Sequence, residues 1–276
     1  MPFLSRPDAE LHYHVDDFTD PWSQSQSLLF HHGHARNLHF WRGWVPRLAG
    51  DYRLVRFDAR GFGRSSVPEA DFEWAPDVFI EDALALLDDL GIERAVWVSE
   101  LLGNIVGLSF ALAHPERLRA LVLCHPICSV SDVHDVPHAT PVDIDALRQQ
   151  IDSIGMREWA KTTLWQRLDA EAATDELGAW VVDQIAATSP TTVLSLRPQV
   201  AGWTQMVTDR LSEIEVPTLL LLADRSRAST SLQAEYMVSE MQNAQIETLP
   251  GAGDGIYLLH PDWCADQTEN FLKNLD

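Results

Sequence analysis

Positive charge is scarce in this sequence. Lysine occurs only at Lys161 and Lys273, and 20 lysine and arginine residues stand against 41 aspartate and glutamate residues, a formal net charge of −21. Such a surface repels polyanions, so we expect no nucleic-acid partner. The acidic residues are spread over the whole chain, which is typical of an ordinary acidic surface and not of a disordered acidic tail.

Cysteine and long apolar runs are scarce too. The three cysteines, Cys124, Cys128 and Cys264, have no framework spacing, which favours a reducing compartment over a secreted disulfide scaffold. The first residues contain no apolar signal core, and no apolar run is long enough to span a bilayer. We therefore expect a cytoplasmic protein with no membrane partner.

Hydrophobic periodicity alternates between two kinds of pattern over most of the chain. Strand patterns cover residues 11–15, 27–32, 52–57, 95–98, 118–124, 217–222 and 246–249. Helical patterns cover residues 38–48, 78–90, 102–113, 232–241 and 261–275. This order predicts the α/β class, with a mostly parallel twisted sheet and helices on both faces.

The alternation stops between residues 128 and 213, where the pattern is helical throughout. We therefore expect a core domain of residues 1–127 and 214–276, with a helical cap subdomain at 128–213. Trp159 and Trp165 of the cap are candidate ligand contacts, although tryptophan at helical spacing also fills ordinary cores.

Four segments of the predicted core carry a family resemblance. They are Phe30-His31-His32-Gly33-His34, Phe57 to Ser65, Ser99 to Asn104 leading into His114-Pro115-Glu116-Arg117, and Leu249 to Gly255. Together they resemble the α/β-hydrolase superfamily, above all its capped branch of enol-lactonases, C–C bond hydrolases and small esterases. The resemblance implies the α/β-hydrolase fold and a pocket for a small-molecule ligand or substrate between sheet and cap.

The resemblance also implies a serine nucleophile, an acid and a histidine base, and this chain has other residues at all three positions. Counting back from His114 places Leu101 at the turn that carries the serine in the family. Asp254 ends a Pro-Gly-Ala-Gly string where the family has histidine, and Ser226 takes the position of the acid. Leucine has no nucleophilic atom, so we expect the conventional Ser-His-Asp mechanism to be absent.

The family's oxyanion hole falls on the backbone amides of His34 and Leu102, and backbone donors survive side-chain change. The candidates for acid–base catalysis are Asp254, Glu100 and His34. Two of them have structural alternatives: Asp254 between two glycines suits a loop cap, and Glu100 suits a structural hydrogen bond.

Other reactive residues have weaker signals. Ser99 and Cys124 are candidates for an atypical nucleophile. His31, His32, His34 and His39 cluster in sequence, but strand alternation sends His31 and His32 to opposite faces, so we expect no metal site. We also expect no cofactor, because the segment around Gly61 and Gly63 lacks the third glycine of a dinucleotide site.

Three functions stay open at this point. The first is an enzyme doing non-hydrolytic or water-mediated acid–base chemistry, of the lyase, decarboxylase or isomerase type, on a small hydrophobic carbonyl compound. The second is a ligand-binding pseudoenzyme with no turnover. The third is an atypical hydrolase of an ester, a lactone or a C–C bond. Exposed cap helices in such folds also leave a homodimer open.

Overall fold

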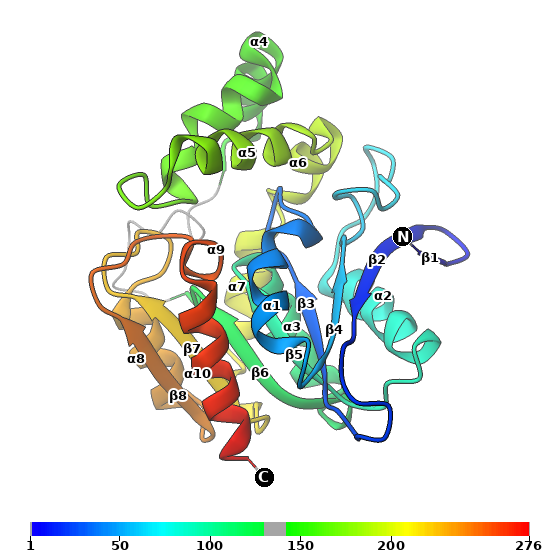
Figure 1. Cartoon of the computed structure of the whole chain (residues 1–276). Coiled ribbons are helices and arrows are strands. Elements are labelled where there is room, and N and C mark those ends of the chain that lie inside the picture. Colours follow the sequence, from blue (N-terminus) through cyan, green and yellow to red (C-terminus); the bar gives the residue numbers. More distant parts are fainter. Residues whose placement is uncertain (1, 130–141, 276) are drawn as a thin grey trace.

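One sheet runs through the protein in the order β1-β2-β4-β3-β5-β6-β7-β8 (Figure 1). The structure is a computed structural model that describes residues 2–129 and 142–275. The strands are β1 (Phe3–Ser5), β2 (Glu10–Asp16), β3 (Ser27–His31), β4 (Arg53–Phe57), β5 (Ala95–Glu100), β6 (Leu118–Cys124), β7 (Thr218–Ala223) and β8 (Ala244–Leu249). Strand β2 pairs antiparallel with both β1 and β4, and the neighbours from β4 to β8 in the sheet order pair in parallel. The predicted mostly parallel sheet is confirmed.

Both faces of this sheet are covered by helices. They are α1 (Val45–Leu48), α2 (Pro76–Asp89), α3 (Leu102–Ala113), α8 (Ser231–Glu240), α9 (Ile256–Leu259) and α10 (Pro261–Lys273), together with the short 3-10 helices η1 (Leu38–Trp44), η2 (Pro115–Arg117) and η4 (Leu211–Glu213). The helix predicted at 38–48 starts as a 3-10 helix, because Pro46 has no N–H for the carbonyl of Arg42; the N–H of Val45 bonds that carbonyl instead.

The central strands are apolar on both sides, as parallel strands between two helix layers must be. Leu29, Trp97 and Leu121 pack into one cluster with α2, α3 and α8. Their neighbours on the opposite face pack with α1 and α10 in a second cluster that includes Phe30 and Val98. Because β3, β5 and β6 run parallel to one another, their carboxyl ends meet at one edge of the sheet.

The helical segment between β6 and β7 consists of α4 (Ile144–Thr162), η3 (Leu164–Gln166), α5 (Asp175–Ala186), α6 (Pro190–Leu196) and α7 (Val200–Thr208). Helices α4, α5 and α6 lie beyond the carboxyl edge of the sheet, whereas α7 lies beside α3 in the core (Figure 1). Residues 130–141 of the expected cap lie outside the described residues. The cap boundaries at 128 and 213 stay a prediction.

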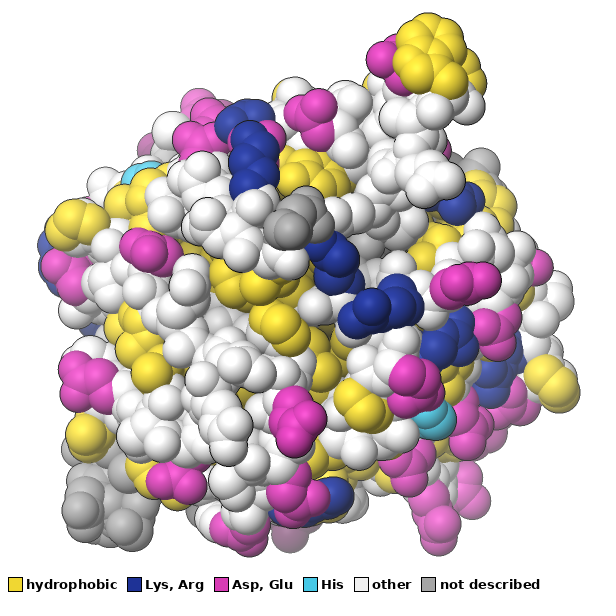
Figure 2. Space-filling view, turned by 90° about the horizontal axis from the view of Figure 1, so that it is seen from below, with side chains coloured by type: hydrophobic (Ala, Val, Ile, Leu, Met, Phe, Trp, Pro, Cys, Tyr) yellow, Lys and Arg dark blue, Asp and Glu magenta, His cyan; other side chains and the backbone are white. Residues whose placement is uncertain are grey.

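The surface reflects the composition. Figure 2 shows the face opposite α4, where acidic side chains lie mostly toward the periphery and several basic side chains lie next to one another while others stand apart. No helix in the described part of the chain is both long and apolar enough to cross a membrane.

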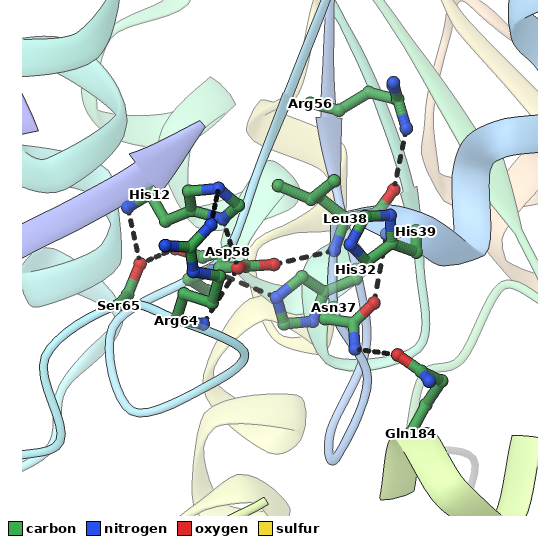
Figure 3. A network of polar contacts seen from close by, with 11 residues as sticks. His12, His32, Asn37, Leu38, His39, Arg56, Asp58, Arg64, Ser65 and Gln184 are labelled. Carbon is green, nitrogen blue, oxygen red and sulfur yellow. Dashed lines mark hydrogen bonds and ion pairs between the residues drawn. The ribbon is translucent and has the colours of Figure 1, made fainter. Parts of the chain in front are cut away.

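A buried polar network holds the loop after β4 against the rest of the core (Figure 3). Asp58 is at its centre: its Oδ2 lies 2.7 Å from Nδ1 of His12, and it accepts hydrogen bonds from the amides of Leu38 (2.8 Å) and Arg64 (2.9 Å). Both His12 and Asp58 are buried. Buried polar groups are costly unless they are satisfied, so this network depends on its central carboxylate.

We expect Asp58→Ala to lower the free energy of unfolding by about 3 kcal/mol, because it leaves one imidazole and two amides unsatisfied in a dry interior. Urea denaturation of the two proteins measures this difference. Asp51→Ala, at an exposed position, is the matched control and should change stability little. Equal stabilities for wild type and Asp58→Ala would show that the network does not hold the loop.

Candidate functional site

A sharp turn joins β5 to α3, and Leu101 forms it. Its backbone has φ 47° and ψ −105°, outside the regions that leucine prefers, and its side chain is 5% exposed. A conformation of this kind costs about 1–3 kcal/mol and persists only where the surroundings impose it. The structure thus places Leu101 at the apex of the strand-to-helix turn, as the sequence predicts.

The carboxylate of Glu100 lies behind this turn and ties it to the loop after β3. It accepts a hydrogen bond of 2.6 Å from the amide of Gly33 and pairs with Nε of Arg36 at 3.1 Å. A Cβ at Gly33 would lie 2.1 Å from the same oxygen, so only glycine fits there. Burial raises the pKa of Glu100, and the guanidinium of Arg36 opposes this shift. Glu100 therefore positions the loop that carries His34.

A cavity of about 200 Å³ opens between this edge of the sheet and the helices beyond it. Its apolar wall is formed by Leu101, Leu102, Ile127, Val142, Leu147, Trp159, Val193 and Val200, and its polar wall by His34, Arg36, Gln150, Thr163, Gln166, Arg167 and Arg197. The structure brings four of the sequence candidates together here: His34, Leu101, Leu102 and Trp159.

Asp254 is not part of the wall of this cavity. Its Oδ1 accepts hydrogen bonds from the hydroxyl of Ser226 (2.6 Å) and the amide of Ala228 (3.1 Å), and its carboxylate also accepts from the amide of Arg227 (3.2 Å). It lines a separate, shallower hollow together with Trp165, whose side chain is half exposed. Ser226 and Asp254 thus bond each other, and the carboxylate of Asp254 accepts hydrogen bonds from the loop after β7.

His125 joins this pair, and the sequence analysis did not single it out. Its Nε2 accepts hydrogen bonds from the amides of Gly255 (2.9 Å) and Ile256 (3.3 Å), so its proton belongs on Nδ1, 3.4 Å from Oγ of Ser226. Burial lowers the pKa of His125 to about 4. The available signal was its place directly after β6, at the same sheet edge as Leu101.

The atypical nucleophile candidates are engaged in the core. Ser99 is buried and donates to Oδ1 of Asn104 (2.8 Å), whose amide group donates to the carbonyls of Cys124 and His125. The thiol of Cys124 is buried as well, and burial raises its pKa far above the usual range. Neither side chain is in the cavity wall.

The N-terminal histidines differ from expectation in one respect. The rings of His31 and His32 lie 5.8 Å apart instead of on opposite faces, because β3 ends at His31 and the strand alternation ends with it. His31 stacks on Trp97, and His32 contacts Phe62. Within residues 2–129 and 142–275 no three His, Cys, Asp or Glu side chains are grouped to hold a metal ion.

Sequence reasoning also missed the arginines of the cavity, Arg36, Arg167 and Arg197. Arg36 lies in the loop between β3 and η1, whereas Arg167 follows η3 and Arg197 follows α6. No motif links these positions, since they are brought together only by the packing of cap helices over the sheet edge.

The strand-to-helix turn and the glycine loop after β3, with a cavity above the sheet edge, are typical of proteins with the α/β-hydrolase fold. Residues 26–261 match the model of the alpha/beta hydrolase fold family, and the chain belongs to that family. The resemblance seen in the sequence and the expected fold are confirmed.

Individual relatives are similar over parts of the chain. A 2-hydroxymuconate semialdehyde hydrolase of Pseudomonas sp. strain CF600 is 38% identical over 99 residues, 35% of each chain. Epoxide hydrolase A of Mycobacterium tuberculosis is 37% identical over 95 residues, 34% of this chain and 30% of that one. The matches span about a third of these curated relatives. The crystal structure of the enol-lactonase from Burkholderia xenovorans LB400 has a TM-score of 0.85 at 21% identity, covering 99% of this chain and all of that one, so it shares the fold.

The lowered pKa of His125 predicts a loss of stability in acid. Its folded value of about 4 is below the unfolded value of 6.5, so the stabilisation is complete above pH 6.5 and is lost as the pH falls towards 4. His125 should account for about 3 kcal/mol of the unfolding free energy lost between pH 7 and pH 4. His31 and His32 shift in the same direction.

Urea denaturation at several pH values separates these contributions. His125→Gln should reduce the acid-induced loss relative to wild type, whereas the control His114→Gln, at a partly exposed position, should not. An identical pH dependence in wild type and His125→Gln would contradict the assignment of a buried neutral imidazole.

Proposed function

We propose that this protein binds a small, largely apolar carbonyl compound in the cavity beside Leu101 and holds it without forming a covalent acyl intermediate. The observation that carries the proposal is the side chain at the turn. An aliphatic group occupies the place from which a nucleophile would reach the ligand, and it forms part of an apolar wall instead.

The contacts of the other candidates support the same conclusion. Asp254 is occupied by the hydroxyl of Ser226 and two backbone amides, and it lines a different hollow. The Oε1 of Glu100 binds the amide of Gly33 and pairs with Arg36, while its Oε2 is buried and has no hydrogen-bond partner among the described residues. We therefore propose a loop-capping role for Asp254 and a positioning role for Glu100, in place of direct proton transfer by either. The amides of His34 and Leu102 are proposed to bind the ligand's carbonyl oxygen.

The remaining proposals follow from the same picture. A small molecule is the proposed partner, and the buried free thiols of Cys124, Cys128 and Cys264 suit the cytoplasm that the sequence suggested. A homodimer remains an expectation from the cap helices alone.

A fluorescent fluorophosphonate probe tests the absence of a covalent intermediate. We expect no labelling of the wild-type protein, because the probe traps only an activated serine, while a conventional serine hydrolase in the same gel is labelled. The variant Leu101→Ser, Ser226→Asp, Asp254→His restores the three residue types at the proposed positions and should acquire labelling. Labelling of the wild type that disappears in Ser99→Ala would overturn the proposal in favour of an atypical hydrolase.

A second function is favoured by one observation: His34 lines the cavity beside Leu101. An imidazole there, next to the proposed oxyanion amides, is placed to move a proton on a bound carbonyl compound. This would be the non-hydrolytic acid–base enzyme, of the lyase, decarboxylase or isomerase type, with His34 as its catalytic residue.

Solvent hydrogen exchange distinguishes the two functions. If His34 moves protons, incubation of the protein with a ketone such as 2-hexanone in deuterated water exchanges the hydrogens next to the carbonyl, and His34→Gln lowers that rate by roughly 100-fold or more. If the protein only binds, NMR shows no exchange above the buffer rate in either protein. We expect the second result.

A further inference from the structure

Three arginines line the cavity beside Leu101, and they come from separate parts of the chain. Arg36 lies in the loop after β3, Arg167 follows η3 and Arg197 ends α6. The chain has a net charge of −21, yet none of the described residues that line the cavity is an aspartate or glutamate. The cavity is therefore basic inside an acidic protein.

The positive charge of these arginines is only partly balanced. Arg36 is buried, pairs with Glu100 at 3.1 Å and donates to the carbonyl of His34 at 3.2 Å. Among the described residues, the carboxylate of Glu100 acts on both Arg36 and Arg167, and that of Asp254 acts on Arg36 as well. Glu100 contacts Arg36 directly, so its carboxylate balances the charge of Arg36 more than that of Arg167.

Arg167 is the arginine with the least compensation. Its Nε is buried and has no hydrogen-bond partner among the described residues, and its guanidinium lies 5.1 Å from the ring centre of Trp159. Burial, together with the charges of Arg36 and Arg197, lowers the pKa of Arg167 to about 9. A charged group is costly to hold in such surroundings without an anion beside it.

The rest of the wall is apolar and the space is small. Leu101, Ile127, Val193 and Val200 face the same cavity of about 200 Å³. A polyanion or an inorganic ion alone would leave this apolar surface unused. A ligand that suits both halves of the cavity has an acidic head and a short apolar body.

We propose that the cavity selects a small organic carboxylate, with the carboxylate group bound by Arg167 and Arg197 and the apolar body packed against Leu101. This inference rests on the proposed function, since it names the ligand class of the same cavity. The planar guanidinium offers two parallel donors that match the two oxygens of a carboxylate, which favours this group over a neutral carbonyl.

Isothermal titration calorimetry tests the inference by comparing the affinities of the protein for matched pairs of acid and amide. The probes are hexanoate with hexanamide and 4-phenylbutanoate with 4-phenylbutanamide, at pH 7 in buffer free of other organic acids. The members of each pair have nearly the same shape, and the amide replaces one oxygen of the charged carboxylate by a neutral NH2 donor. We expect at least one acid to bind about tenfold or more tightly than its amide, the ratio that a single charge-assisted hydrogen bond supplies.

Variants assign the preference to the arginines. Arg167→Gln and Arg197→Gln should each reduce the affinity for the acid by about tenfold while leaving that for the amide nearly unchanged, which shows that the cavity is intact. Arg210→Gln is the control, because Arg210 is exposed and pairs with Glu213 far from the cavity wall. Without ligand, Arg167→Gln should unfold at the same temperature as wild type or a higher one, because it removes an uncompensated charge; a purely structural arginine would lower it.

The outcomes separate the two proposals. Equal affinities of acid and amide, both abolished by Leu101→Trp, would overturn the carboxylate inference and leave the binding function intact. Absence of binding for all four probes would overturn both. A preference for the acid that survives in Arg167→Gln and Arg197→Gln would overturn the assignment to these residues.

Discussion

The buried carboxylate of Glu100 is the contact on which the geometry of the sheet edge depends. It joins the end of β5 to the amide of Gly33 and the guanidinium of Arg36, so two loops from neighbouring strands are held by one group. The loop approaches Glu100 so closely that there is no room for a side chain at residue 33. Leu101, which follows Glu100, has a positive φ of 47°, and Arg36 reaches the cavity wall from the loop that Glu100 contacts.

A second polar network lies at the carboxyl edge of the sheet, in which His125 faces Ser226 and Ser226 donates to Asp254. The amides of residues 227, 228, 255 and 256 complete it. Every strong acceptor in this network is used within the protein, which is why we assign it to loop geometry and not to a reaction on a ligand.

The sequence predicted the layers well because their signals are local. The helix at 102–113 and the strand at 118–124 have the bounds that the periodicity indicated. The register that places Leu101 at the turn could also be counted, since the helix length is fixed by its hydrophobic pattern. The rings of His31 and His32 could not be placed, because alternation holds only while the strand continues.

The sequence predicted only those site residues that lie within a local motif. Glu100 and Leu101 lie within the segment 99–104 that carries the family resemblance, so their positions follow from that motif. Arg167 follows η3 and Arg197 follows α6, and no motif records how these elements pack against the sheet edge. The carboxylate of Asp254 bonds a serine 28 residues earlier and is not part of the cavity wall. Long-range packing decided which polar groups face the cavity and which are consumed in the loops around it.

A crystal structure of the protein with 4-phenylbutanoate is the most direct measurement of the central claim. The account predicts an intact, non-covalent acid whose carboxylate contacts Arg167 and Arg197 and whose ring packs beside Leu101. An adduct on a protein side chain, or an acid bound beside Asp254 with the cavity empty, would contradict it.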